Sequence, residues 1–130
     1  RRQRCNEYSL TIYFKKNEIQ PIKLEKSEYT GYDICEVFSG LVCDKKAVIE
    51  ISAHSSPDEK DKQNLSLKRG QFLKDTLVKL GINPARLIIK AYGDTRPAEL
   101  KDVNGLVVGL AAYEERRRVV FSVIRSDFKE

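Results

Sequence analysis

The sequence lacks several features that would indicate a membrane protein or an enzyme. No apolar run approaches the roughly 20 residues that a membrane-spanning helix needs, so we expect no direct membrane insertion. There is one histidine, and there is neither a G-x-S-x-G nucleophile motif nor a recognised nucleic-acid motif. The chain has no methionine and begins Arg-Arg-Gln-Arg without a signal peptide. We therefore expect a piece excised from a longer protein.

Cysteine is scarce, and its spacing argues against a metal or redox site. The three cysteines, Cys5, Cys35 and Cys43, form no C-x-x-C pair, so no metal or cofactor is implied. On one straight helix Cys35 and Cys43 would lie about 12 Å apart, too far for a disulfide. Since an odd number cannot pair completely, we expect buried free thiols. One bridge through Cys5 is the alternative.

Length and composition fit one globular domain with an excess of basic residues. The chain has 130 residues, of which 41% are hydrophobic and 33% are charged. The net charge is +5, with local basic runs at residues 1–4 and 116–118. We interpret these charges as a solvated surface, with attraction to an anionic polymer as the alternative. Nucleic acid is not expected as a partner.

Apolar periodicity predicts strands and helices in the order β-α-β-α-β-β. Strands are predicted over residues 8–14, 47–53, 87–91 and 116–124. Helices are predicted over 26–42, with Ser27 as N-cap, and over 65–80, with Gly81 just after the end. Residues 99–113 are expected to form a long surface loop. Short links imply right-handed crossovers, which favours an α+β two-layer sandwich whose mixed sheet is covered by helices on one face.

A polar corner between the second strand and the second helix is the candidate site. Strand alternation through Ala53 delivers His54, Ser55 and Ser56 to the carboxyl edge of the sheet, and helical periodicity begins at Leu65. A loop of this kind collects backbone N–H groups and short polar side chains. It is a suitable place to hold a small charged ligand.

Five segments resemble motifs of one family, in the family's order. Residues 12–17 (IYFKKN) resemble its first strand and the turn F-D-x-N/D, and residues 49–56 (IEISAHSS) resemble ϕ-x-ϕ-x-G-H-T-D. Residues 65–70 (LSLKRG) resemble L-S-x-x-R-A. Residues 92–97 (YGDTRP) and 117–119 (RRV) resemble G-Y-G-x-x-x-P and N-R-R-V. Together they resemble the OmpA-like C-terminal domain, the peptidoglycan-binding module also found in peptidoglycan-associated lipoprotein and MotB.

The resemblance implies a non-enzymatic anchor that binds the diaminopimelate of the peptidoglycan stem peptide without a covalent bond. The anchored partner would be the rest of an outer-membrane-associated protein or complex in the periplasm of a Gram-negative bacterium. Residues 1–130 would form one such domain, with a core over 8–124 and tails at 1–7 and 125–130. In the family the arginine of L-S-x-x-R meets the ligand carboxylate, a role that falls on Arg69. A guanidinium suits that role because its planar fork matches a carboxylate.

The chain departs from the family where the ligand's ammonium would bind. The Asp of H-T-D is replaced by Ser56 and the Thr by Ser55, and losing a charge-assisted contact costs about 1–3 kcal/mol. We hypothesise that Asp58 restores the negative charge. The loop is also shorter than the family pattern. The family's loop asparagine falls on Lys62, and Asn64 is expected to take its place.

Three further residues are assigned roles by the resemblance or by their chemistry. Asn17 matches a pocket position in the first turn, with an ordinary turn residue as the alternative. Arg117 matches the first arginine of R-R-V, and we expect it to brace the loop acids and, secondarily, to contact ligand. His54 is expected to be structural, because one crowded loop supplies neither an oriented base nor an oxyanion hole.

Two other classes of function stay open. One is an OmpA-like fold with a degenerate site that serves as a protein-interaction or assembly module, which the loss of Asp at Ser56 favours. The other is an enzyme acting on the cell wall. It would require turnover that His54→Ala abolishes.

Overall fold

The computed structural model describes residues 9–22 and 34–130, and its main sheet is mixed, as predicted. In spatial order its strands are β1 (Ser9–Tyr13), β6 (Arg118–Ser126), β2 (Ala47–Ala53) and β3 (Leu87–Ala91). β2 and β3 are parallel, whereas β6 is antiparallel to both of its neighbours. The prediction of four main strands in an α+β fold is therefore confirmed.

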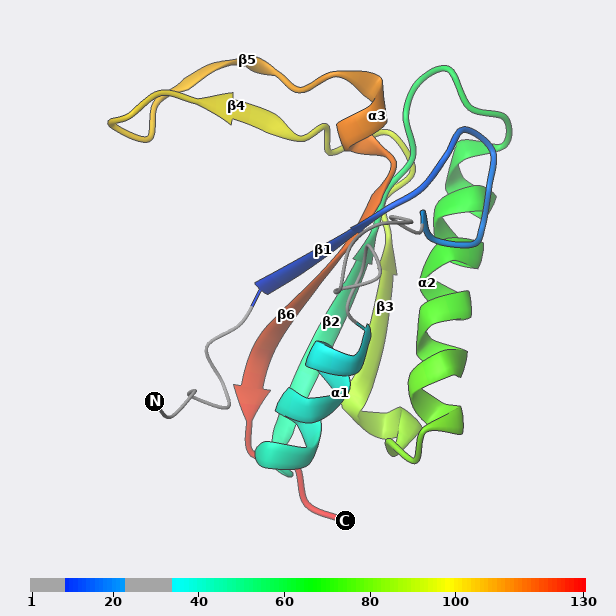
Figure 1. The fold of residues 1–130 in the computed structure, drawn as a ribbon, viewed down its shortest axis with the longest axis vertical. Coiled ribbons are helices and arrows are strands. Elements are labelled where there is room, and N and C mark those ends of the chain that lie inside the picture. Colours follow the sequence, from blue (N-terminus) through cyan, green and yellow to red (C-terminus); the bar gives the residue numbers. More distant parts are fainter. Residues whose placement is uncertain (1–8, 23–33) are drawn as a thin grey trace.

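Two helices form the second layer over this sheet (Figure 1). These are α1 (Ile34–Cys43) and α2 (Lys62–Lys79). Val37 and Leu41 of α1 and Leu73 and Leu77 of α2 lie in one buried cluster with the apolar residues of β2. Burial of this shared apolar surface holds the two layers together.

The helix boundaries follow local backbone chemistry. α2 begins at Lys62, three residues before the apolar period starts at Leu65, because Asp61 ends the preceding loop with a left-handed backbone (φ 47°) and accepts the Leu65 N–H at 2.8 Å. Gly81 follows the helix with φ 108°, as expected for a residue just beyond a helix end. The predicted start of the first helix, with Ser27 as N-cap, lies outside the described residues.

A buried arginine connects the 3₁₀ helix η1 (Pro84–Arg86) with the end of α1 and the start of β2. This helix precedes β3 and buries Arg86. Its guanidinium donates to the carbonyls of Leu41 (2.8 Å), Asp44 (2.6 Å) and Ala47 (2.9 Å). Arg86 thereby satisfies carbonyl groups around the end of α1 that have no helical partner.

The prediction of a long surface loop over residues 99–113 is wrong. This stretch forms the hairpin of β4 (Glu99–Lys101) and β5 (Val107–Leu110), then the short helix α3 (Tyr113–Arg116). Gly105 takes φ 82° in the turn, and Asp102 Oδ1 accepts the N–H groups of Asn104 and Leu106. The hairpin projects away from the main sheet as a separate arm (Figure 1).

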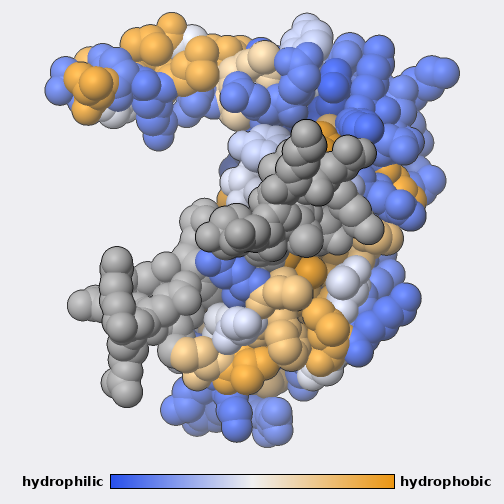
Figure 2. Space-filling model, in the orientation of Figure 1, coloured by the Kyte–Doolittle hydropathy of each residue, from blue (hydrophilic) through white to orange (hydrophobic). Residues whose placement is uncertain are grey.

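The hairpin carries apolar side chains on the surface. The exposed ones include Leu100, Val103, Leu106, Val107, Val108 and Leu110. They form much of the hydrophobic surface along the projecting arm in Figure 2. The arm thus contributes little to the buried core.

The prediction of buried free thiols is also wrong for Cys35 and Cys43, whereas Cys5 lies outside the described residues. Cys35 is free but exposed, and Cys43 is disulfide-bonded. The expectation that Cys35 and Cys43 do not pair with each other is confirmed. In the described ranges no helix is long and apolar enough to cross a membrane, and no cluster of His, Cys, Asp or Glu side chains has the arrangement of a metal site.

Candidate functional site

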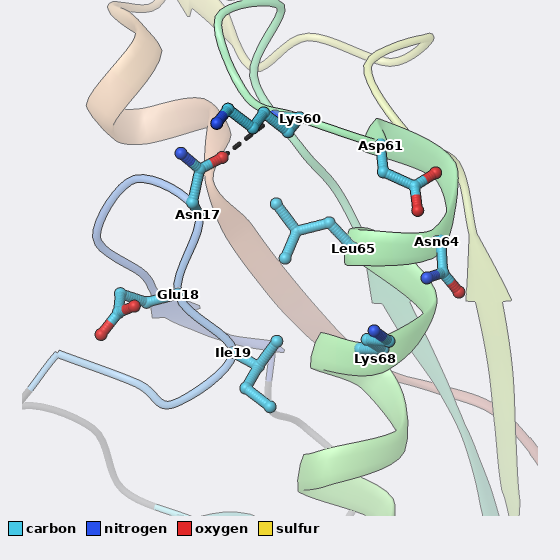
Figure 3. Close-up of a pocket in the computed structure, with 8 residues that line it drawn as sticks. All are labelled: Asn17, Glu18, Ile19, Lys60, Asp61, Asn64, Leu65 and Lys68. Carbon is cyan, nitrogen blue, oxygen red and sulfur yellow. Dashed lines mark hydrogen bonds between the residues drawn. The ribbon is translucent and has the colours of Figure 1, made fainter.

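The predicted corner brings together two segments that are distant in the sequence. One is the loop between β2 and α2. The other is the turn over residues 15–19, which follows β1 and in which Asn17 has a left-handed backbone (φ 63°). Figures 1 and 3 show both segments at the N-terminal end of α2. They are linked directly, because Asn17 Oδ1 accepts the Lys60 N–H at 3.0 Å.

Arg69 lies beneath this corner with its guanidinium fully buried. Nη1 donates to Glu59 Oε1 at 2.8 Å, and Nη2 donates to Glu59 Oε2. The other donors reach the carbonyls of Glu18 (Nε, 2.8 Å), His54 (Nη1, 3.1 Å) and Lys15 (Nη2, 3.2 Å). All five N–H donors of the side chain are therefore engaged. Arg69 is therefore not an ordinary surface residue of α2.

Arg69 binds the carboxylate of Glu59, a residue that no sequence motif had indicated. Glu59 also accepts the backbone N–H groups of Asn17 and Ser56, each at 2.8 Å. Burial raises the pKa of Glu59, but the hydrogen bonds from Arg69 and the two backbone groups outweigh it and hold the pKa below its usual value. Glu59 thus remains charged and joins the loop, the turn and α2.

A second polar cluster braces the same loop. Arg117 donates to Ser56 Oγ (Nε, 3.0 Å) and to Asp58 Oδ2 (Nη2, 2.9 Å), and Ser56 Oγ donates to Asp58 Oδ1. Lys16 lies 3.6 Å from Asp58. The Ser56 hydroxyl and the nearby charges of Arg117 and Lys16 lower the pKa of Asp58. The predicted pairing of Arg117 with a loop acid is confirmed, whereas the contact of Asp58 with a ligand ammonium stays a prediction.

Ser55 and His54 both serve the fold around the strand end. Ser55 Oγ donates to the Lys62 carbonyl at 2.7 Å, and the Ser55 N–H donates to Gly93 O at 2.7 Å. The His54 ring is buried and stacks on Tyr92, with 5.3 Å between ring centroids. Its Nδ1 has no hydrogen-bond partner among the described residues. Burial, with smaller effects from Arg118 and Arg96, lowers the pKa of His54 to about 4.

A cavity of about 470 Å³ opens between the turn after β1 and the start of α2 (Figure 3). Its lining comes from the turn after β1, from the end of the β2–α2 loop and from the start of α2: Asn17, Glu18, Ile19, Lys60, Asp61, Asn64, Leu65 and Lys68. Two residues predicted for the site, Asn17 and Asn64, lie in this lining. The other five, Ser55, Ser56, Asp58, Arg69 and Arg117, lie in the surrounding structure and not in the lining.

The cavity offers charges of both signs. Its cations are Lys60 and Lys68, and its acids are Glu18 and Asp61. Among the residues that the structure describes, none of these four side chains forms an ion pair. Figure 3 shows Leu65 projecting from α2 into the space between the two segments. The lining thus combines an apolar patch with groups able to pair with a carboxylate and with an ammonium.

The charged lining could not be predicted from the sequence, because no periodic pattern connects its residues. Asn64 and Lys68 are separated by one helical turn and share a face of α2, but this face is apparent only once the helix is known to begin at Lys62. The useful signal was the dense alternation of acids and lysines from Asp58 to Lys62.

Comparisons with known proteins agree with this architecture. A family model described as "OmpA family" matches residues 13–105. No curated protein matches. The peptidoglycan-associated lipoprotein from Burkholderia pseudomallei has a similar structure (TM-score 0.66, 15% identity), which covers 88% of this chain and 89% of that one.

Two further solved structures share the fold. A putative MotB-like protein from Desulfovibrio vulgaris has a TM-score of 0.64 and 16% identity, with 90% of this chain and 74% of that chain covered. The cell wall anchor of the T6SS from Pseudomonas aeruginosa has a TM-score of 0.59 and 17% identity, with 88% and 79% covered. At these identities the likeness shows a common fold.

Proposed function

Because the chain belongs to the OmpA family, we propose that it binds peptidoglycan without a covalent bond and anchors a larger protein or complex to the cell wall. The proposed ligand is the stem peptide, recognised at its diaminopimelate residue. The proposed place of action is the periplasm, in association with the outer membrane. Structural neighbours described as a peptidoglycan-associated lipoprotein and as a cell wall anchor support this proposal.

The observation that carries the proposal is the cavity at the β2–α2 corner. Diaminopimelate has an ammonium and a carboxylate on one carbon, and the cavity presents two lysines and two acids within one lining. Asn17 and Asn64 add amide donors and acceptors that suit a peptide backbone. Single contacts of this kind are weak, so firm anchoring would depend on many copies acting on a repeating polymer.

We propose binding without catalysis. His54 is buried and neutral near pH 7, and it stacks on Tyr92 without facing the cavity lining. The carboxylates of Glu59 and Asp58 are held by Arg69 and Arg117. General acid–base chemistry needs a group free to exchange a proton with the substrate.

The direct test is co-sedimentation with insoluble peptidoglycan. We expect the wild-type domain to sediment, and we expect Asn64→Trp to weaken binding more than tenfold, because an indole at this exposed position would fill the cavity. Gln71→Trp, an equally exposed change further along α2, is the matched control and should bind like wild type. Wild-type protein that stays in the supernatant at all concentrations would contradict the proposal.

A protein-interaction or assembly module is the second candidate. The observation in its favour is that Glu59 occupies the guanidinium of Arg69 and that Ser56 stands where the family has an Asp. A folded domain that binds neither insoluble peptidoglycan nor a soluble stem peptide would place this function first.

A further inference from the structure

We propose that Lys60 and Lys68, not Arg69, receive the ligand's carboxylate in this chain, and that Arg69 instead holds the binding loop through Glu59. This inference rests on the proposed function and assigns the polar contacts within it. It differs from the role that the family resemblance implies for Arg69.

Arg69 has no N–H donor left for a ligand. Two of its N–H groups bind Glu59, and the other three bind backbone carbonyls from the turn after β1 and the end of β2. A ligand carboxylate could reach the guanidinium only by displacing Glu59. Glu59 already provides the carboxylate that matches the planar guanidinium of Arg69.

Displacing Glu59 would disrupt the structure of the site. Glu59 also accepts the N–H groups of Asn17 and Ser56, so its departure would leave two backbone donors unpaired. The same movement would separate the turn that carries Asn17 from the loop that carries Lys60. Both segments contribute to the cavity, so a ligand that expelled Glu59 would dismantle the walls that hold it.

Lys60 and Lys68 are both available at the cavity. Both line the cavity, and neither is ion-paired within the described part of the chain. Lys60 is fixed through its backbone N–H, which donates to Asn17 Oδ1, and Lys68 projects from the second turn of α2. Figure 3 shows the two side chains on opposite sides of Leu65. A carboxylate above Leu65 would therefore lie between two cations.

The ligand's ammonium is assigned by the same reasoning. Asp58 is bound to Arg117 and lies close to Lys16, so its charge is already matched. Asp61 lines the cavity and has no ion pair among the described residues. Glu18 also lines the cavity without an ion pair in the described ranges, so the acids of the lining, Asp61 and Glu18, supply the negative charge that Ser56 lacks.

The experiment titrates the domain with a soluble stem peptide containing diaminopimelate, followed by calorimetry and by NMR of the arginine Nε–H signals. We expect Lys60→Ala/Lys68→Ala to lower affinity at least tenfold. Lys45→Ala/Lys79→Ala, in the turn between α1 and β2 and at the last residue of α2, is the charge-matched control and should bind like wild type. The Arg69 Nε–H signal should not shift at saturation. Amidating the ligand's diaminopimelate carboxylate should weaken binding to wild type but not to the double variant.

Three results would overturn the inference. Wild-type affinity in Lys60→Ala/Lys68→Ala would show that the lysines do not receive the carboxylate. A shifted Arg69 signal in wild type, with tighter binding by Glu59→Gln, would show that the ligand displaces Glu59. If Glu59→Gln does not fold, the Arg69 signal of the wild type decides alone. In these cases the wild type still binds, and the proposed function stands. Absence of binding to both the stem peptide and insoluble peptidoglycan would overturn the proposed function and this inference together.

Discussion

His54 is a buried imidazole that the fold keeps uncharged. It lies where β2 leaves the sheet, against the ring of Tyr92, and its Nδ1 meets no hydrogen-bond partner in the described ranges. A proton on this ring would be placed in a poorly solvated site near Arg118 and Arg96. The histidine is therefore a source of pH-dependent stability.

We predict that the domain loses stability as the pH falls below neutrality. The pKa of His54 is about 4 in the folded chain against 6.5 for an ordinary histidine, so the unfolded chain takes up the proton first. The free energy of unfolding should drop by about 2 kcal/mol between pH 7.5 and pH 5. Urea denaturation across this range measures the effect.

His54→Phe is the matching variant, since it keeps an aromatic ring and cannot titrate. Its stability should be nearly constant between pH 7.5 and pH 5. The lowered pKa values of Glu59 and Asp58 act only further down, near and below their ordinary values of 4.5 and 3.8. An equal loss of stability in wild type and variant would refute the assignment to His54.

At the scale of residues, the kind of group that Arg69 binds was easier to predict than its identity. The family resemblance implies that Arg69 binds a ligand carboxylate, and in the structure it binds an internal one. The carboxylate belongs to Glu59, brought there by a loop whose path depends on Asn17 and Arg117, which lie far away in the sequence. No local pattern encodes such a contact, because it forms only when three segments meet.

At the scale of elements, the contact between α2 and the sheet depends on a glycine, which has no side chain to separate them. Gly70 is buried in α2, and a Cβ atom there would lie 2.9 Å from Ile89 Cγ2 on β3. The glycine therefore lets the helix approach β3 closely. The close packing offsets the larger entropic cost of ordering a glycine, which has more conformational freedom in the unfolded chain than other residues.

We predict that Gly70→Ala destabilises the domain by about 1 kcal/mol, although alanine is the better helix former. Overpacking costs of roughly 1–3 kcal/mol exceed the helical gain of about 1 kcal/mol. Chemical denaturation measures the change. In an Ile89→Leu background, which removes the γ2 methyl group, the same substitution should be neutral or stabilising. Stabilisation in the wild-type background would contradict this packing.

Strands and helices of five or more residues could be predicted from the sequence, and the shorter strands β4 and β5 could not. β2 and α2 run over seven and 18 residues, enough for a period to emerge. β2 was predicted with its observed bounds, and α2 was predicted to begin at Leu65, three residues late. β4 and β5 have three and four residues and surface-exposed apolar side chains, so nothing distinguished them from a loop. Their pairing is set by the turn at Gly105 and by Asp102.

At the scale of the whole molecule, the hairpin is an appendage to the sandwich. β4 and β5 form a sheet of their own, and their apolar side chains are exposed. The hairpin begins and ends at one point, where the Ala111 N–H donates to the Ala98 carbonyl at 2.8 Å. The main core is complete without it.

We predict that replacing residues 99–110 by two glycines leaves the domain folded. The free energy of unfolding should change by less than about 1 kcal/mol, because little apolar surface is exposed or buried by the change. Thermal and urea denaturation provide the measurement, with the intact chain as reference. A loss well beyond this value would mean that the arm supports the sandwich.

The position of β1 has a mechanical consequence. β1 leads directly into the turn that forms one wall of the cavity, and it lies antiparallel along β6 from the Ser9–Ser122 pair to the Tyr13–Arg118 pair. Tension applied before Ser9, against a ligand held at the cavity, would pull along the strand. The hydrogen bonds between β1 and β6 lie across that direction, so they would be loaded together in shear and not opened one after another. An edge strand in this geometry transmits force along its whole length.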